Sequence, residues 1–66
     1  MENKEELAGK LIGMDMEEAI SLLTESETSF RILSVDGEKF MVTQDFQPDR
    51  FNLIIMSGKV DDILFG

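Results

Sequence analysis

The chain has 66 residues, with six Lys or Arg against fourteen Asp or Glu, so its formal net charge is −8 at pH 7. That length allows one small domain and excludes a two-domain enzyme. The sequence contains no Cys and no His, which excludes disulfides, the usual zinc sites and Ser–His or Cys–His nucleophiles. We therefore expect a protein that is not an enzyme and that uses neither a metal nor a cofactor.

Charge and hydropathy also predict the partners and the location of the protein. A net charge of −8 argues against direct binding to nucleic acid, which requires a basic surface. No apolar run approaches the roughly 18–20 residues that cross a membrane, and residues 1–6 lack the apolar stretch of a signal peptide. The sequence thus predicts a cytoplasmic protein that binds another protein, and that is a monomer or a weak homo-oligomer.

The sequence indicates helix in two stretches, and the helical pattern is weaker in the first of them. Residues 1–10 are mostly polar and are interrupted by Gly9, so we interpret them as a frayed or partly helical N-terminal arm before a domain at 11–66. The stronger pattern covers residues 15–26, where Asp15 and Glu18 have the spacing of a capping box. One face of this helix is apolar at i, i+3, i+4 and i+7: Met16, Ala19, Ile20 and Leu23.

Three strands are predicted downstream of this helix, at residues 30–35, 51–56 and 60–65. The first two are rich in apolar and β-branched residues, which favour strands. Alternate residues of 51–56 are strongly apolar, so we expect one face of that strand to lie in the core.

The connection 36–50 is long for so small a domain, and such loops are usually functional or disordered. Two interpretations remain open. Asp36-Gly37 is a strong two-residue turn signal, which predicts a hairpin between the preceding strand and residues 38–43. In the other interpretation, residues 42–46 are extended and exposed.

Residues 42–53 read VTQDFQPDRFNL. This string resembles the reactive-loop region of the potato inhibitor I superfamily of serine protease inhibitors, which includes chymotrypsin inhibitor 2 and eglin. The resemblance is strongest to the branch classed as peptidase inhibitor I78, whose pattern reads roughly V-T-x-D-[YF]-x-P-D-R-L-N-[VI]. Upstream, LIGMDMEEA at 11–19 is similar to the helix entry L-[VI]-G-x-[ST]-x-E-E-A of that family, and Gly66 matches as well.

The resemblance implies an α+β fold of one small domain: one helix packed on a small mixed sheet, with an extended exposed loop between two roughly parallel strands. It also implies binding to a serine protease, either subtilisin-like or chymotrypsin-like, with Gln44–Asp45 as the scissile bond. The implied supports of the loop are Arg50 and Asn52. The implied protease-binding loop consists of Val42, Thr43, Gln44, Asp45, Phe46 and Gln47.

Because the chain has no disulfide, side chains must hold such a loop in shape. A guanidinium at the start of a strand can bond the Thr43 hydroxyl or carbonyl and pair with Asp45, and we expect Arg50 to do so. The alternative is an ordinary surface ion pair between Arg50 and Asp45, worth about 0–1 kcal/mol.

A second hypothesis is a non-inhibitory acidic interaction module on the same fold, in which the charge of −8 steers a basic partner and mimics nucleic acid. Gln44 suits neither a deep apolar pocket nor an acidic one, and residues 34–41 are longer than the corresponding approach in the inhibitors. A third, weaker hypothesis is a structural subunit that self-associates through residues 51–56.

Overall fold

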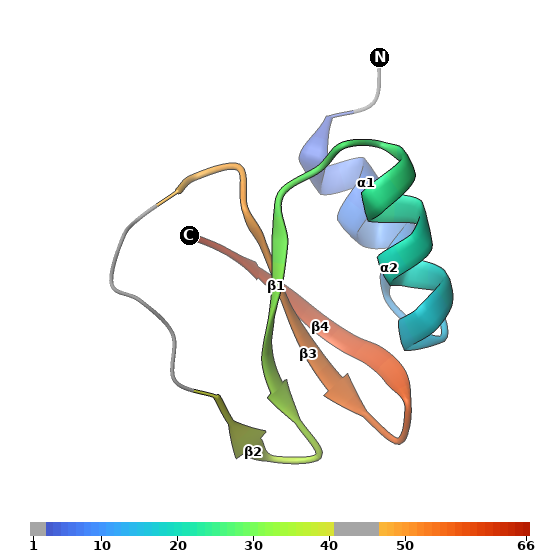
Figure 1. Cartoon of the computed structure of the whole chain (residues 1–66), viewed down its shortest axis with the longest axis vertical. Helices are drawn as coiled ribbons and strands as arrows, with labels where there is room; N and C mark the ends of the chain where they lie inside the picture. The colour runs from blue at the N-terminus through green and yellow to red at the C-terminus, as the bar shows by residue number, and fades with distance from the viewer. Residues whose placement is uncertain (1–2, 41–46) are drawn as a thin grey trace.

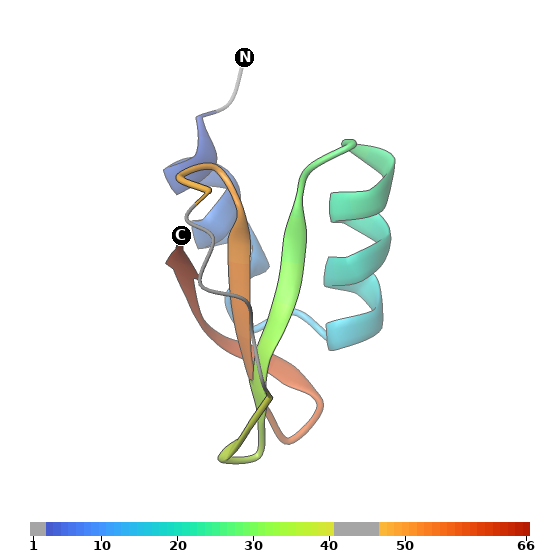
Figure 2. The same cartoon turned by 60° about the vertical axis from the view of Figure 1, so that its left-hand side comes forward.

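The computed structural model describes residues 3–40 and 47–66. Four strands form one sheet in the order β2-β1-β3-β4, in which β1 and β3 run parallel and the other neighbours antiparallel. Figure 1 shows both helices on the right of the strands, and Figures 1 and 2 both show β1 and β3 side by side. The elements are α1 (Lys4–Leu11), α2 (Met16–Glu25), β1 (Phe30–Val35), β2 (Glu38–Lys39), β3 (Phe51–Met56) and β4 (Lys59–Phe65).

Most of the predicted elements are confirmed. The helix expected at residues 15–26 is α2, and β1 and β3 have the predicted bounds. The final strand begins at Lys59 rather than at Val60. The sheet is mixed and its two central strands are parallel, so the α+β class is also confirmed.

The number of helices was predicted wrongly, because residues 4–11 form α1. Asn3 caps this helix, with its side-chain oxygen accepting from the Glu6 N–H at 2.8 Å. Ala8 and Leu11 are buried in the core, so α1 packs with the rest of the domain. A short, mostly polar helix interrupted by Gly9 depends on such packing for its stability, which local sequence patterns do not report.

The capping box expected at the start of α2 was also predicted wrongly. Asp15 occupies the N-cap position, but its side chain makes no capping hydrogen bond. The Met16 N–H donates instead to the Gly58 carbonyl at 2.9 Å, and the Val60 N–H donates to the Met14 carbonyl at 2.9 Å. The start of α2 is therefore attached to the turn between β3 and β4 rather than capped locally.

The core lies between the two helices and one face of the sheet. Phe51, on the central strand β3, is 1% exposed, and its ring meets that of Phe65 edge-on with centroids 4.9 Å apart. With no disulfide in the chain, burial of these apolar side chains is the main source of stability. The buried apolar residues are Ala8, Leu11, Ala19, Leu23, Phe51, Leu53, Ile55, Val60 and Ile63.

The turn after β1 shows that the connection 36–50 begins with a hairpin, one of the two interpretations left open by the sequence. Asp36 and Gly37 both have positive φ, 50° and 87°, as in the tight turn of a two-residue hairpin, and β2 pairs antiparallel with β1. The Asp36 carboxylate also accepts a hydrogen bond from the Ser57 N–H at 2.8 Å. The hairpin is therefore confirmed for residues 38–39, and the Phe40 N–H adds a bond to the Leu33 carbonyl at 3.0 Å. The rest of the predicted arm, 41–43, and the extended loop at 42–46 lie outside the described residues.

Candidate functional site

The predicted protease-binding loop is described only at its final residue. Residues 42–46, and with them the expected contacts of Arg50 with Thr43 and Asp45, lie outside the part of the chain that the structure describes. Gln47 is exposed, and its carbonyl accepts a hydrogen bond from the Arg50 N–H at 2.9 Å. Residues 47–50 thus form a turn that leads directly into β3.

Arg50 and Asn52, the two predicted supports, lie together at the start of β3. Both are buried, with exposed fractions of 8% and 4%. The Arg50 Nε and the Asn52 Nδ2 both donate to the Gly66 carbonyl, at 3.0 and 3.1 Å, and Asn52 Nδ2 also donates to the Leu64 carbonyl at 3.1 Å. The two side chains therefore join the start of β3 to the end of β4.

Arg31 is a third member of this group that sequence reasoning missed. It pairs with Asn52 across the parallel strands β1 and β3, and its Nε donates a hydrogen bond to Asn52 Oδ1. A charged residue inside a mostly apolar strand was the available signal, but the partner depends on a strand register that the sequence does not show. We call the group formed by Arg31, Arg50, Asn52 and the Gly66 carbonyl the arginine–asparagine cluster.

The cluster satisfies the polar atoms that it buries. The oxygen of the Asn52 side-chain amide accepts a hydrogen bond from Arg31, and its nitrogen donates to backbone carbonyls. This one side chain therefore connects β1, β3 and the end of β4. Among residues 3–40 and 47–66, no buried side-chain nitrogen or oxygen lacks a hydrogen-bond partner. Because buried polar groups with all partners in place are costly to disrupt, these hydrogen bonds oppose separation of the strands at this end of the sheet.

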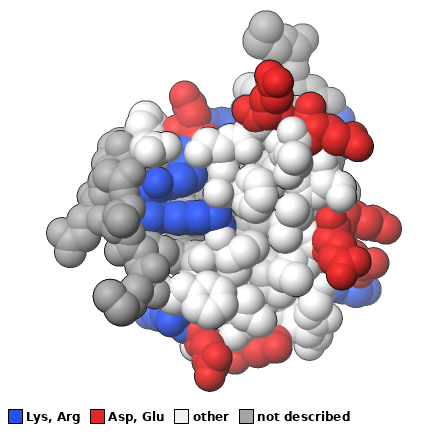
Figure 3. Space-filling model, in the orientation of Figure 1, with Lys and Arg blue, Asp and Glu red and all other residues white. Residues whose placement is uncertain are grey.

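The cluster lies on the face of the sheet that the helices leave uncovered. Side chains alternate along a strand, so Asn52 faces away from the core to which Phe51 and Leu53 belong. Figure 3 shows acidic side chains around the rim of the molecule, whereas basic ones gather mainly at its left side. Arg31 donates to Asn52, and Arg50 donates to the Gly66 carbonyl that Asn52 also bonds, so both arginines of this acidic chain belong to the cluster.

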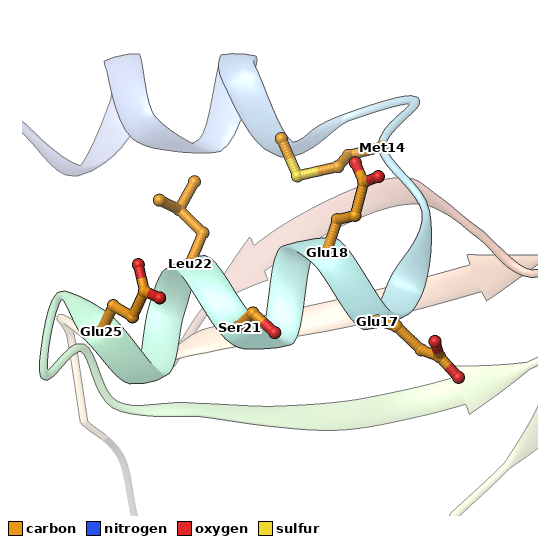
Figure 4. A pocket seen from close by; sticks show the side chains of 6 residues that line it. All are labelled: Met14, Glu17, Glu18, Ser21, Leu22 and Glu25. Carbon is orange, nitrogen blue, oxygen red and sulfur yellow. The ribbon is translucent and has the colours of Figure 1, made fainter.

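A shallow groove along α2 is one of several further hollows on the surface. It has a volume of about 500 Å³ and is open to solvent along the helix. In Figure 4, Leu22 and Glu18 point from α2 toward the α1 side, and Met14 lies across from them. The lining residues are two apolar, one polar and three acidic: Met14, Leu22, Ser21, Glu17, Glu18 and Glu25.

Two further findings concern other kinds of site. In the residues that the structure describes, no group of three or more acidic side chains is placed to hold a metal ion. Neither α1 nor α2 has the length and apolar character of a membrane-spanning helix.

A scan against protein-family models and a search of curated proteins find no match for this chain.

Proposed function

We propose that the protein is a serine protease inhibitor of the I78 type, which presents residues 42–47 to the protease in a substrate-like extended form. The observation that supports this best is the arginine–asparagine cluster, because two of its members, Arg50 and Asn52, come directly after this segment in the chain. Arg50 is 8% exposed, and its Nε donates a hydrogen bond to the Gly66 carbonyl. This burial distinguishes Arg50 from a residue of an ordinary surface ion pair. A rigid support at the end of a loop lowers the cost of ordering the loop upon binding.

Both ends of the segment are attached to the same strand. Before it, the Phe40 N–H donates to the Leu33 carbonyl of β1 at 3.0 Å. After it, the Phe51 N–H donates to the Ser29 carbonyl at 3.0 Å, next to β1, and β3 continues parallel to β1. If a protease cuts Gln44–Asp45, the two new ends stay attached to one sheet, which favours religation over release.

The resemblance to the inhibitors implies the roles of the loop residues. Gln44 enters the primary specificity pocket of the protease, and the carbonyl of Gln44 is the group that the protease attacks. The guanidinium of Arg50 pairs with Asp45, which keeps the leaving side of the scissile bond in place. A subtilisin-like or chymotrypsin-like enzyme, with an open cleft for an extended strand, is the class of partner.

The test is inhibition of a panel of subtilisin-like and chymotrypsin-like proteases by the wild-type chain and by Gln44→Ala. The wild type should inhibit at least one enzyme stoichiometrically, and Gln44→Ala should inhibit it about tenfold less because the pocket loses its side-chain contact. Glu38→Ala, on exposed β2, is the matched control and should inhibit like the wild type. Equal inhibition by Gln44→Ala, or none by the wild type, contradicts the proposal.

A second candidate function, an acidic interaction module, is favoured by the groove along α2. Its lining combines Met14 and Leu22 with three glutamates, which suits a basic segment with an apolar anchor. Binding of such a partner should fall steeply between about 50 and 200 mM salt, because exposed charges are screened over this range. It should also be insensitive to Gln44→Ala, which separates the two functions.

A further inference from the structure

Lys4, the first residue of α1, contacts two distant parts of the chain, the Pro48–Asp49 turn and the end of β4. Its Nζ donates a hydrogen bond to the Pro48 carbonyl at 2.8 Å and lies 3.5 Å from the Asp49 carboxylate. The same ammonium lies 5.0 Å from the centroid of the Phe65 ring. Figure 2 shows residues 47–50 passing next to the start of α1, as these contacts require.

The position of this lysine is unfavourable for the helix alone. A cation in the first turn opposes the helix dipole, whereas Glu5 and Glu6 in the same turn complement it. A carbonyl, a carboxylate and the face of an aromatic ring offset that cost, because each is attracted to an ammonium. The contacts with residues 48–49 and with Phe65 therefore account for a lysine at this site.

The turn that Lys4 contacts lies at the surface of the domain. Asp49 is highly exposed, and the turn is closed by the hydrogen bond from the Arg50 N–H to the Gln47 carbonyl. The Phe65 ring beneath Lys4 packs edge-on against Phe51 in the core. Lys4 thus connects an exposed turn to α1 and to the end of β4.

We propose that Lys4 is a positioning residue, which fixes the Pro48–Asp49 turn and thereby the direction in which the preceding segment joins β3. Its effect on the protease rests on the proposed inhibitory function. By holding the leaving side of the scissile bond, Lys4 slows hydrolysis of the loop. Lys4 touches neither the protease nor the scissile bond in this role.

The first test measures amide hydrogen exchange by NMR in Lys4→Gln. The Arg50 amide, which closes the turn, should exchange about three- to tenfold faster, as expected for the loss of one partly exposed charged contact. Lys4→Arg, which keeps a cationic donor, should restore slow exchange. Lys59→Gln removes the same charge at the far end of β4 and should leave the Arg50 amide unchanged.

A purely structural role in the helix predicts a different pattern. Removing an unfavourable cation from the first turn would leave global stability the same or raise it, and would not single out the Arg50 amide. Unchanged exchange at Arg50 in Lys4→Gln therefore overturns the proposal. So does an equal acceleration at Leu53 in the centre of the sheet, because that would report general unfolding.

The second test measures cleavage of the loop during incubation with an inhibited protease. Lys4→Gln should be cut about three- to tenfold faster than the wild type, and Lys4→Arg at the wild-type rate. An equal rate for Lys4→Gln and the wild type overturns the effect on the loop. If the wild type inhibits no protease, the proposed function fails, and the exchange at Arg50 alone decides whether Lys4 fixes the turn.

Discussion

Replacing Arg50 with alanine is expected to weaken inhibition of a susceptible serine protease by about a hundredfold. The guanidinium donates to the Gly66 carbonyl from a site that is 8% exposed, and we propose that it also pairs with Asp45. Hydrogen bonds to charged groups contribute about 1.5–3 kcal/mol each, and about 1.4 kcal/mol corresponds to a tenfold change in affinity. Titration of the variant against the inhibited protease, at a temperature where circular dichroism shows it folded, measures the effect.

Two variants control this experiment. Lys39→Ala removes the same charge from exposed β2, at the other end of the segment, and should inhibit like the wild type. Arg50→Lys keeps the charge but loses the planar fork of donors, so it should recover only part of the lost inhibition. Wild-type inhibition by a folded Arg50→Ala would show that the arginine–asparagine cluster does not support the loop.

Replacing Phe51 with alanine should produce the largest loss of stability. Its ring is 1% exposed and meets the Phe65 ring edge-on at 4.9 Å, so truncation leaves a cavity at the centre of the core. Such a change costs about 3–5 kcal/mol. Domains of this size have a total stability of only about 3–10 kcal/mol at 0.05–0.15 kcal/mol per residue. Urea denaturation followed by circular dichroism should therefore find much of Phe51→Ala unfolded even without urea.

Phe40→Ala is the matched control for the core. Phe40 is 47% exposed, so the same change of side chain removes little buried surface. Its midpoint in urea should stay close to that of the wild type, because exposed substitutions usually change stability by about 0.5 kcal/mol or less. Similar losses for the two variants would contradict the placement of the core between the helices and β3.

The parts of the fold that were predictable are those with strong local patterns. The apolar face predicted for α2 includes its two buried residues, Ala19 and Leu23, whereas Met16 and Ile20 are only partly buried. The alternation along β3 likewise marks the residues that enter the core, so the bounds of both elements could be read from the sequence. The Asp36-Gly37 turn was a local signal too, because few residue pairs adopt positive φ twice in succession. Arg50 and Asn52 were found through a motif, and the structure brings them together on the Gly66 carbonyl.

The parts that were missed depend on contacts between distant residues. The amphipathic pattern of α1 is weak, and its stability comes from burying Ala8 and Leu11 against strands far along the chain. The Met16 N–H is satisfied by the Gly58 carbonyl, which replaces the expected capping box. Arg31 joins the cluster only because β1 and β3 are parallel and place it beside Asn52.

Mass spectrometry of the chain during incubation with an inhibited protease tests the central claim most directly. Substrate-like presentation of residues 42–47 predicts a single, slow cleavage at Gln44–Asp45, with inhibition persisting because both ends remain attached to β1 and β3. Rapid cleavage at several other bonds, or inhibition without any cleavage at Gln44–Asp45 over long incubation, would contradict it.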